Sequence, residues 1–200
     1  MKGYTLTELL VSITIITIIA IAGSALAKNV VSYNSSAQAS LDAQLEGKRV
    51  LKIMVAELRT VAPSVLGSYP LETVATSSIT FYADINGNGQ TDRVRYFIDP
   101  TTRVLKKGVT APSGSPLTYN LGNEQTTTLI TDIANGTTTD MFEYYDASYA
   151  GTSTPLAIPV DVSRVRLVKI TAIIDRDPNR SPTTISLISE VSLRNLKDNL

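Results

Sequence analysis

The 200-residue chain contains no cysteine, no histidine and no tryptophan. The absence of cysteine excludes disulfide bonds, zinc–thiolate sites and thiol catalysis. The absence of histidine removes the commonest general base and the commonest metal ligand. Net charge is also absent, because 18 Lys and Arg residues balance 18 Asp and Glu residues; no bulk field attracts nucleic acid or anionic lipid. Composition therefore gives no reason to expect an enzyme or a nucleic-acid partner.

A long apolar run lies near the start of the chain. Residues 9–27 carry no charge and are rich in Ile, Leu, Val and Ala. As a helix they would be about 28 Å long, close to the hydrocarbon thickness of a bilayer. Glu8 lies at the entrance of this run, and a carboxylate at the bilayer centre costs about 2.5–3.5 kcal/mol. This cost indicates a functional role for Glu8.

The residues around Glu8 read Gly-Tyr-Thr-Leu-Thr-Glu-Leu-Leu-Val from position 3 to position 11. This segment closely resembles the type IV prepilin signal of pilins and of the pseudopilins of type II secretion. The resemblance implies that a prepilin peptidase cleaves between Gly3 and Tyr4 and N-methylates Tyr4, where the family usually has phenylalanine. It also implies that the apolar run stays on the mature protein as membrane anchor and later as filament core, with Glu8 acting in assembly.

An ordinary secretory signal peptide is the alternative interpretation. Ala25-Leu26-Ala27 is an A-x-A cleavage site, and its use would leave a secreted domain that begins at Lys28. However, the uncharged run is longer than the roughly 7–15 residues typical of such signals, and an acidic residue at position 8 is unusual in them. Both observations favour the prepilin interpretation.

The helix is predicted to continue beyond Lys28, because apolar residues recur at helical spacing with polar residues between them. The stripe consists of Val30, Tyr33, Ala37, Leu41, Leu51, Val55 and Leu58. Pro63 cannot lie inside a helix, so the helix is expected to span residues 4–62. It divides into a membrane half, residues 4–27, and an amphipathic half, residues 28–62, after a leader of residues 1–3.

Residues 63–200 are predicted to form a globular, β-rich domain. A hairpin is expected from strands 79–83 and 94–98 with a turn at 84–89, followed by strands at 103–109, 141–145, 164–174 and 185–193. Residues 110–123 and 147–159 are expected to be loops, and residues 129–134 fit either a short helix or an extended connector. The apolar phase switches at Leu167-Val168, which indicates a bulge or burial on both faces.

The predicted fold class is therefore α+β and pilin-like, with a long N-terminal helix packed on a C-terminal antiparallel sheet domain. The hairpin of residues 81–99 and the final Val-Ser-Leu-Arg-Asn-Leu of residues 191–196 resemble W-type minor pilins and J-type minor pseudopilins. Many major pilins carry a C-terminal disulfide loop, which a chain without cysteine cannot form. Together these features imply a minor subunit in a tip or priming complex.

One motif in the domain matches a metal site. Asp84-Ile85-Asn86-Gly87-Asn88-Gly89 fits the first half of an EF-hand calcium loop, D-x-[DN]-x-[DN]-G. Its candidate ligands are the side-chain oxygens of Asp84, Asn86, Asn88 and Asp92 and the carbonyl of Gln90. The twelfth position, where a bidentate Glu is expected, is Arg95. The alternative is a polar hairpin turn, for which Asn-Gly is a strong signal.

The sequence thus predicts a non-enzymatic minor pilin or pseudopilin of a type IV pilus or a type II secretion system. A membrane-anchored or secreted binding module, an adhesin with or without calcium, is the competing class. The expected partners are the prepilin peptidase and other pilins, contacted through the N-terminal helix. The expected location is the inner (cytoplasmic) membrane, crossed once with the C-terminal domain outside the cytoplasm, and then the filament.

Overall fold

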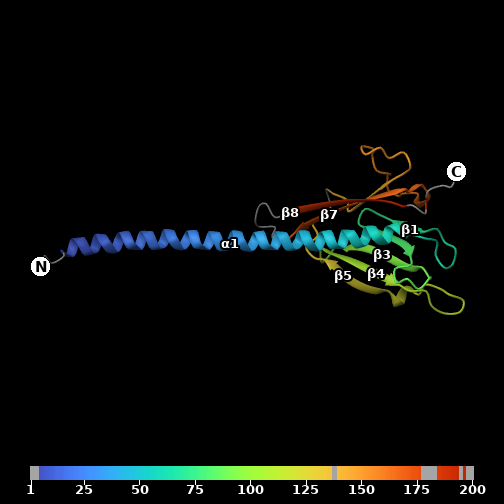
Figure 1. Ribbon diagram of the computed structural model, residues 1–200, viewed down its shortest axis with the longest axis horizontal. Coiled ribbons are helices and arrows are strands. Elements are labelled where there is room, and N and C mark those ends of the chain that lie inside the picture. The colour runs from blue at the N-terminus through green and yellow to red at the C-terminus, as the bar shows by residue number, and fades with distance from the viewer. Residues whose placement is uncertain (1–4, 137–138, 177–183, 194–195, 197–200) are drawn as a thin grey trace. The chain divides into compact units, whose positions relative to one another are not determined.

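The computed structural model describes residues 5–136, 139–176, 184–193 and 196. The chain forms two compact units, Met1–Leu41 and Asp42–Leu200. Helix α1 (Leu6–Arg59) begins in the first unit and ends in the second (Figure 1). The expected start at Tyr4 lies outside the described residues.

The end of α1 differs from the prediction. The helix stops at Arg59 and not at Ala62. Val61 instead forms an antiparallel bridge with Ala83, and the Ala62 N–H donates to the carbonyl of Tyr82 over 2.9 Å. Pairing with the neighbouring strand satisfies these backbone groups in place of another helical turn.

The first sheet is antiparallel and follows the order of the chain. Its strands are β1 (Leu71–Val74), β2 (Ser78–Ala83), β3 (Asp92–Asp99), β4 (Val104–Thr110) and β5 (Gln125–Ile130), in the order β1-β2-β3-β4-β5. The predicted hairpin is confirmed as β2 and β3, and the third predicted strand as β4. Residues 129–134 are not helical: β5 ends at Ile130, and Ile133 forms a bridge with Ile174.

The second sheet has the order β6-β7-β8, with β6 (Phe142–Tyr145), β7 (Leu167–Asp175) and β8 (Thr184–Ser192). Strand β7 begins later than predicted, because Asp161 caps a 3₁₀ turn over Val162–Arg164. Its pairing with β8 has no register shift, and three successive residues, Ile170, Thr171 and Ala172, are buried. The pairing excludes a bulge; the apolar phase changes because Val165 lies in the turn before the strand, whereas Val168, Ile170, Ala172 and Ile174 alternate within it.

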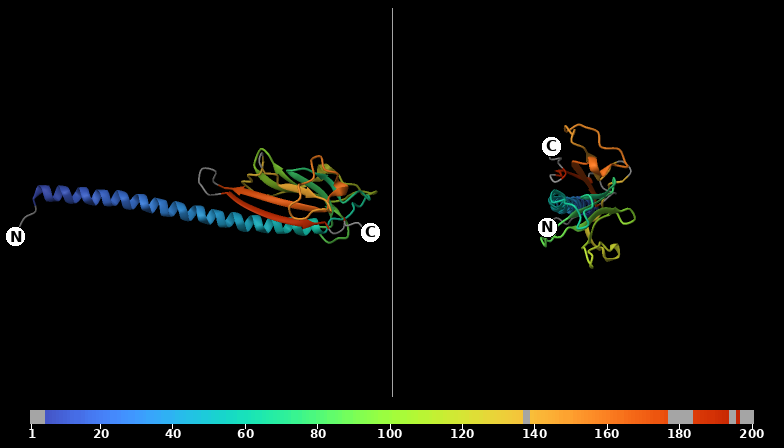
Figure 2. Two further views of the ribbon diagram at one scale, coloured as in Figure 1. Left: turned by 90° about the horizontal axis from the view of Figure 1, so that it is seen from above. Right: turned by 90° about the vertical axis from the view of Figure 1, so that its right-hand side faces the viewer.

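The C-terminal part of α1 lies between the two sheets of the second unit, with β7 and β8 on one side and β3 to β5 on the other (Figures 1 and 2). Its buried residues are Ala43, Gly47, Val50, Leu51, Met54 and Leu58. All of these except Gly47 belong to one hydrophobic core cluster with residues of both sheets. Burying a side chain such as Leu58 stabilises the fold by about 1.5–3 kcal/mol.

The helix continues beyond Lys28 as its apolar stripe predicts, and Leu51 and Leu58 of that stripe are buried. Val30, Tyr33 and Leu41 are exposed, whereas Ala43 and Gly47, which were not assigned to the stripe, are buried. A Cβ atom built on Gly47 would come within 2.4 Å of Leu187 Cδ1 and 2.9 Å of Ile174 Cδ1. Small residues are therefore buried here because β7 and β8 approach the helix closely.

Candidate functional site

The anchor segment of α1 exposes a continuous apolar surface. Within α1 an 18-residue window has a mean hydropathy of 2.5, and none of that window is buried. Among the described residues, α1 is the one helix long and apolar enough to cross a membrane by length and composition. Monomeric soluble proteins rarely expose a patch of this size, so this surface requires lipid or other protein as its surroundings. The helix continues without a break through Ala25-Leu26-Ala27.

Glu8 forms a capping box with Thr5 at the start of α1. The Thr5 N–H donates to Glu8 Oε2 over 2.9 Å, and the Glu8 N–H donates to Thr5 Oγ1 over 3.4 Å. The Thr5 hydroxyl also donates to Glu8 Oε2 over 3.0 Å. Sequence reasoning did not use the Thr-x-x-Glu signal that marks this arrangement. Gly3 and Tyr4, the predicted processing residues, lie outside the described residues.

The β2–β3 loop is organised by Asp84. Its Oδ1 accepts the N–H groups of Gly87 at 2.8 Å and Asn88 at 3.2 Å, and its Oδ2 accepts the Gly89 N–H at 2.8 Å. Gly87 and Gly89 have φ values of 73° and 81°, a region that favours glycine. These N–H donors lower the pKa of the Asp84 carboxyl below its usual value of 3.8, and the Gly89 N–H has the largest effect.

The remaining predicted ligands join the same network. Asn86 Nδ2 donates to Asp92 Oδ2 over 3.0 Å, while Asn86 Oδ1 accepts the Asn88 N–H at 3.0 Å. Asn88 Oδ1 accepts the Gln90 N–H at 2.8 Å. The structure therefore brings Asp84, Asn86, Asn88 and Asp92 together, with Gln90 attached through its backbone N–H.

Asp92 is the unusual member of this network. Its side chain lies at the first position of β3, and the residue is only 1% exposed. Within the described parts of the chain, its Oδ1 atom is buried and has no hydrogen-bond partner. Burial, together with the nearby charge of Asp84, raises the pKa of Asp92. Among the residues described, no group of three or more His, Cys, Asp or Glu side chains is placed to hold a metal, so any cation here would depend on amide oxygens.

Tyr119 fixes the C-terminal end of the loop. Its hydroxyl donates to the carbonyl of Thr91 over 2.7 Å and accepts the Val65 N–H at 3.2 Å. The Thr91 hydroxyl in turn donates to the carbonyl of Pro63 over 3.2 Å. The loop is thereby tied to the segment that follows α1. Tyr119 falls in the predicted loop of residues 110–123, where no spacing signal marked it.

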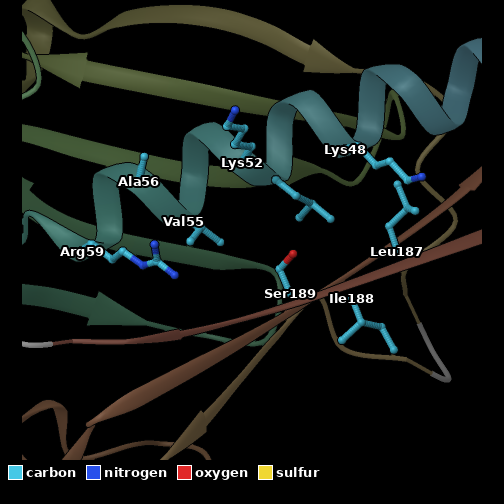
Figure 3. A pocket seen from close by; sticks show the side chains of 9 residues that line it. Lys48, Lys52, Val55, Ala56, Arg59, Leu187, Ile188 and Ser189 are labelled. Carbon is cyan, nitrogen blue, oxygen red and sulfur yellow. The ribbon is translucent and has the colours of Figure 1, made fainter.

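An open groove of about 380 Å³ lies between α1 and β8 (Figure 3). It is lined by Lys48, Leu51, Lys52, Val55, Ala56, Arg59, Leu187, Ile188 and Ser189. In the described part of the chain, none of its three basic residues forms an ion pair. Such a lining can hold an apolar side chain flanked by a carboxylate.

The basic residues of the second sheet are engaged by carboxylates or backbone carbonyls. Arg164 pairs with Asp146 at 2.9 Å and Lys169 with Glu143 at 2.7 Å. Arg166 donates to the carbonyl of Ser163 over 2.6 Å. This part of the surface therefore offers little uncompensated positive charge for phosphate contacts.

Comparison with known proteins matches the N-terminus. Residues 1–24 match the family described as the prokaryotic N-terminal methylation motif. No curated protein and no solved structure matches the chain. In its motif and its long helix packed on antiparallel sheets, the chain is similar to type IV pilins and pseudopilins, a class of generally non-enzymatic structural subunits. The motif implies processing by a prepilin peptidase, and with the apolar helix it indicates membrane anchoring followed by pilus assembly.

Proposed function

We propose that this protein is a minor pilin or pseudopilin that takes its place in the tip or priming complex of a type IV pilus or a type II secretion pseudopilus. The observation that carries the proposal is the methylation motif of residues 1–24, which runs directly into an apolar helix with no buried residue in its anchor segment. Cleavage between Gly3 and Tyr4 leaves that helix on the mature protein.

The anchor serves two apolar environments in turn. Before assembly the helix crosses the inner membrane once, with the sheet domain outside the cytoplasm. In the filament the same side chains pack against the helices of neighbouring pilins. Because both environments are apolar, transfer from one to the other changes the hydrophobic energy little, and polar contacts determine the register of the subunits.

Glu8 supplies such a contact. After cleavage, Tyr4 carries a free amine that is positively charged at neutral pH. A lone carboxylate in an apolar filament core is strongly penalised unless it is paired. The amine of a neighbouring subunit is the cation that the anchor region offers, so the Glu8–amine pair acts as an assembly latch.

The minor, tip-associated position rests on two features. The chain has no cysteine and so cannot form the C-terminal disulfide loop common in major pilins. Its hairpin and terminal strand resemble those of W-type and J-type minor subunits. A tip subunit needs an anchor on one side and a folded cap on the other, and a helix with two antiparallel sheets at its C-terminal end fits that requirement.

The mature N-terminus tests the class. Mass spectrometry of the protein produced with a prepilin peptidase should find N-methylated Tyr4 as the first residue. Gly3→Trp should leave the leader uncut, because the peptidase needs a small residue before the scissile bond. Lys28 as first residue, or normal processing of Gly3→Trp, would contradict the proposal.

The tip position needs a separate test. An epitope tag at the C-terminus, labelled with gold on sheared filaments, should appear at one filament end. Labels distributed along the shaft would overturn the tip assignment and leave the pilin class standing.

A further inference from the structure

We propose that the β2–β3 loop, residues 84–92, is a calcium site whose central ligand is the buried carboxylate of Asp92. The proposal is independent of the filament role, because it concerns the sheet domain alone. It rests on three observations: a buried carboxylate oxygen without a hydrogen-bond donor, a set of oxygens with free lone pairs in one hydrogen-bond network, and two carboxylates without an ion pair.

The acceptor is Asp92 Oδ1. Its residue is 1% exposed, and the atom has no hydrogen-bond partner within the described residues. A buried carboxylate oxygen without a partner is costly. Its other oxygen accepts from Asn86 in the loop, so the carboxyl group faces the loop network. A cation bound beside Oδ1 would remove this cost.

Several oxygens of this network keep lone pairs that accept no hydrogen bond. Each carboxylate or amide oxygen offers two lone pairs. Asp84 Oδ2 accepts one N–H, as do Asn86 Oδ1 and Asn88 Oδ1, so each keeps one position. Asp92 Oδ1 keeps both. Four side-chain oxygens in one network therefore keep a lone pair for a cation, although the Asp84 and Asp92 carboxyls also interact with the backbone of Asn86 and Ile85.

The charge is uncompensated. Asp84 and Asp92 form no ion pair with any described residue, whereas the nearby cations are already engaged. Arg93 pairs with Glu72 at 2.6 Å, and Arg95 pairs with Glu124 at 2.6 Å. Against the effect of burial, the charge of Lys107, on β4, lowers the pKa of Asp92. However, the Lys107 Nζ atom lies 2.5 Å from Glu57 Oε1, so this cation is already paired. Among the residues that the structure describes, the two carboxylates therefore keep a negative charge that no ion pair neutralises.

Calcium is the cation that fits this set. It accepts six to eight oxygens in a flexible arrangement, so four protein oxygens can be completed by the Gln90 carbonyl and water. Magnesium demands near-ideal octahedral geometry and gives up its water reluctantly. With two carboxylates and no bidentate Glu at Arg95, the dissociation constant should lie in the range of about 10⁻⁴–10⁻³ M that extracellular modules show. Such a site would be filled outside the cell.

The site would stiffen a surface beyond the loop itself. Thr91 connects the loop to Pro63 and Tyr119, and Tyr119 connects it to Val65. The Tyr82 and Tyr119 rings also pack with centroids 5.2 Å apart. Calcium would therefore hold together the loop, the segment after α1 and the 110–123 loop, which form one end of the sheet domain.

The experiment uses the full chain in detergent, freed of metal with EDTA. Calorimetric titration with CaCl₂ should give binding heat in the wild type, and 10 mM CaCl₂ should raise its melting temperature by roughly 3–6 °C. MgCl₂ should give a much smaller shift. No heat and no shift up to 10 mM CaCl₂, or an equal shift with MgCl₂, would overturn the proposal.

Variants separate a metal ligand from a structural carboxylate. Asp92→Asn should abolish the difference between melting in calcium and in EDTA, whereas Asp140→Asn, an exposed carboxylate outside the loop, should leave it intact. If Asp92→Asn does not fold, Asn88→Asp serves instead. This exposed change adds a carboxylate and should tighten binding roughly tenfold. A calcium response unchanged in these loop variants would refute the site.

Discussion

The Tyr96 hydroxyl donates to Glu57 Oε2 across 2.6 Å, and this bond joins α1 to the centre of the first sheet. Lys107 Nζ lies 2.5 Å from the other oxygen of the same carboxylate. Burial, with the charge of Glu57, raises the pKa of the Tyr96 hydroxyl far above its usual value. Glu57 therefore holds two strands, β3 and β4, to one face of the helix.

Glu57→Ala should lower the free energy of unfolding by about 1.5–3 kcal/mol, because it leaves a charged amine and a buried hydroxyl without their acceptor. Tyr96→Phe should cost less, since Lys107 keeps its partner. Chemical denaturation of both single variants and the double variant gives the coupling energy. A coupling near zero would contradict a shared network. Glu190→Gln, in an exposed pair with Tyr149, is the control.

Gly47→Ala should destabilise the fold although alanine is the better helix former. Its methyl group would lie within 2.4 Å of Leu187 and 2.9 Å of Ile174, and overpacking costs about 1–3 kcal/mol against a gain of about 1 kcal/mol in helix propensity. Gly23→Ala has open space around it and should show no loss. Thermal unfolding compares them, and a stabilised Gly47→Ala would show that β8 moves away easily.

The packing of Gly47 also marks where sequence patterns fail. A hydrophobic stripe is recognised by large apolar residues, so the pattern includes Val30, Tyr33 and Leu41, which are exposed, and omits Ala43 and Gly47, which are buried. The buried face of a helix depends on where another element approaches it, and small residues are chosen where the approach is closest. That information lies in β7 and β8, far along the chain.

Elements with one clear face were predicted correctly. Strands β3 and β8 alternate, because each has one side on the core. Strand β5 was not assigned, since Gln125–Thr128 are polar and exposed and their pairing with β4 leaves no hydrophobic signal. The candidate calcium ligands were found from spacing, but the burial of Asp92 follows from tertiary packing, which spacing does not report.

Acid should destabilise the second unit through Asp99. The hydrogen bond from Lys106 makes the largest contribution to the pKa of Asp99, and the Thr101 N–H makes the next largest. Together they hold this pKa at about 2, below its usual 3.8. A carboxyl with a lowered folded-state pKa stabilises the fold above about pH 4, and this contribution is lost as the pH falls towards 2. Asp99→Asn should therefore flatten the decline in melting temperature between pH 4 and pH 2. An unchanged slope, with Asp140→Asn as reference, would contradict this role.

A chain truncated to begin at Lys28 should be soluble and monomeric. The truncation removes the uncharged run, while the buried face of α1, which starts at Ala43, stays covered by the two sheets. Gel filtration without detergent should give one peak at the monomer mass. Obligate large aggregates would show that the exposed residues from Val30 to Leu45 need a partner.

Replacing Glu8 separates its two roles. The carboxylate caps α1 through Thr5, and in the filament it is proposed to pair with a neighbour's amine. Glu8→Val removes both roles, whereas Glu8→Gln can keep the cap, because Gln serves at the same position of a capping box. Loss of the cap costs about 0.5–2 kcal/mol at the helix start, too little to prevent cleavage or membrane insertion of so apolar a segment.

Both variants should therefore be cleaved after Gly3 and recovered with the membrane fraction. If charge pairing fixes the subunit register, both should be depleted from sheared filaments, since an amide offers a neighbouring amine no compensating charge. If capping alone matters, Glu8→Gln should enter filaments at the wild-type level and Glu8→Val should not. Quantitative immunoblotting of the membrane and filament fractions distinguishes these outcomes, and wild-type incorporation of Glu8→Gln would end the latch hypothesis.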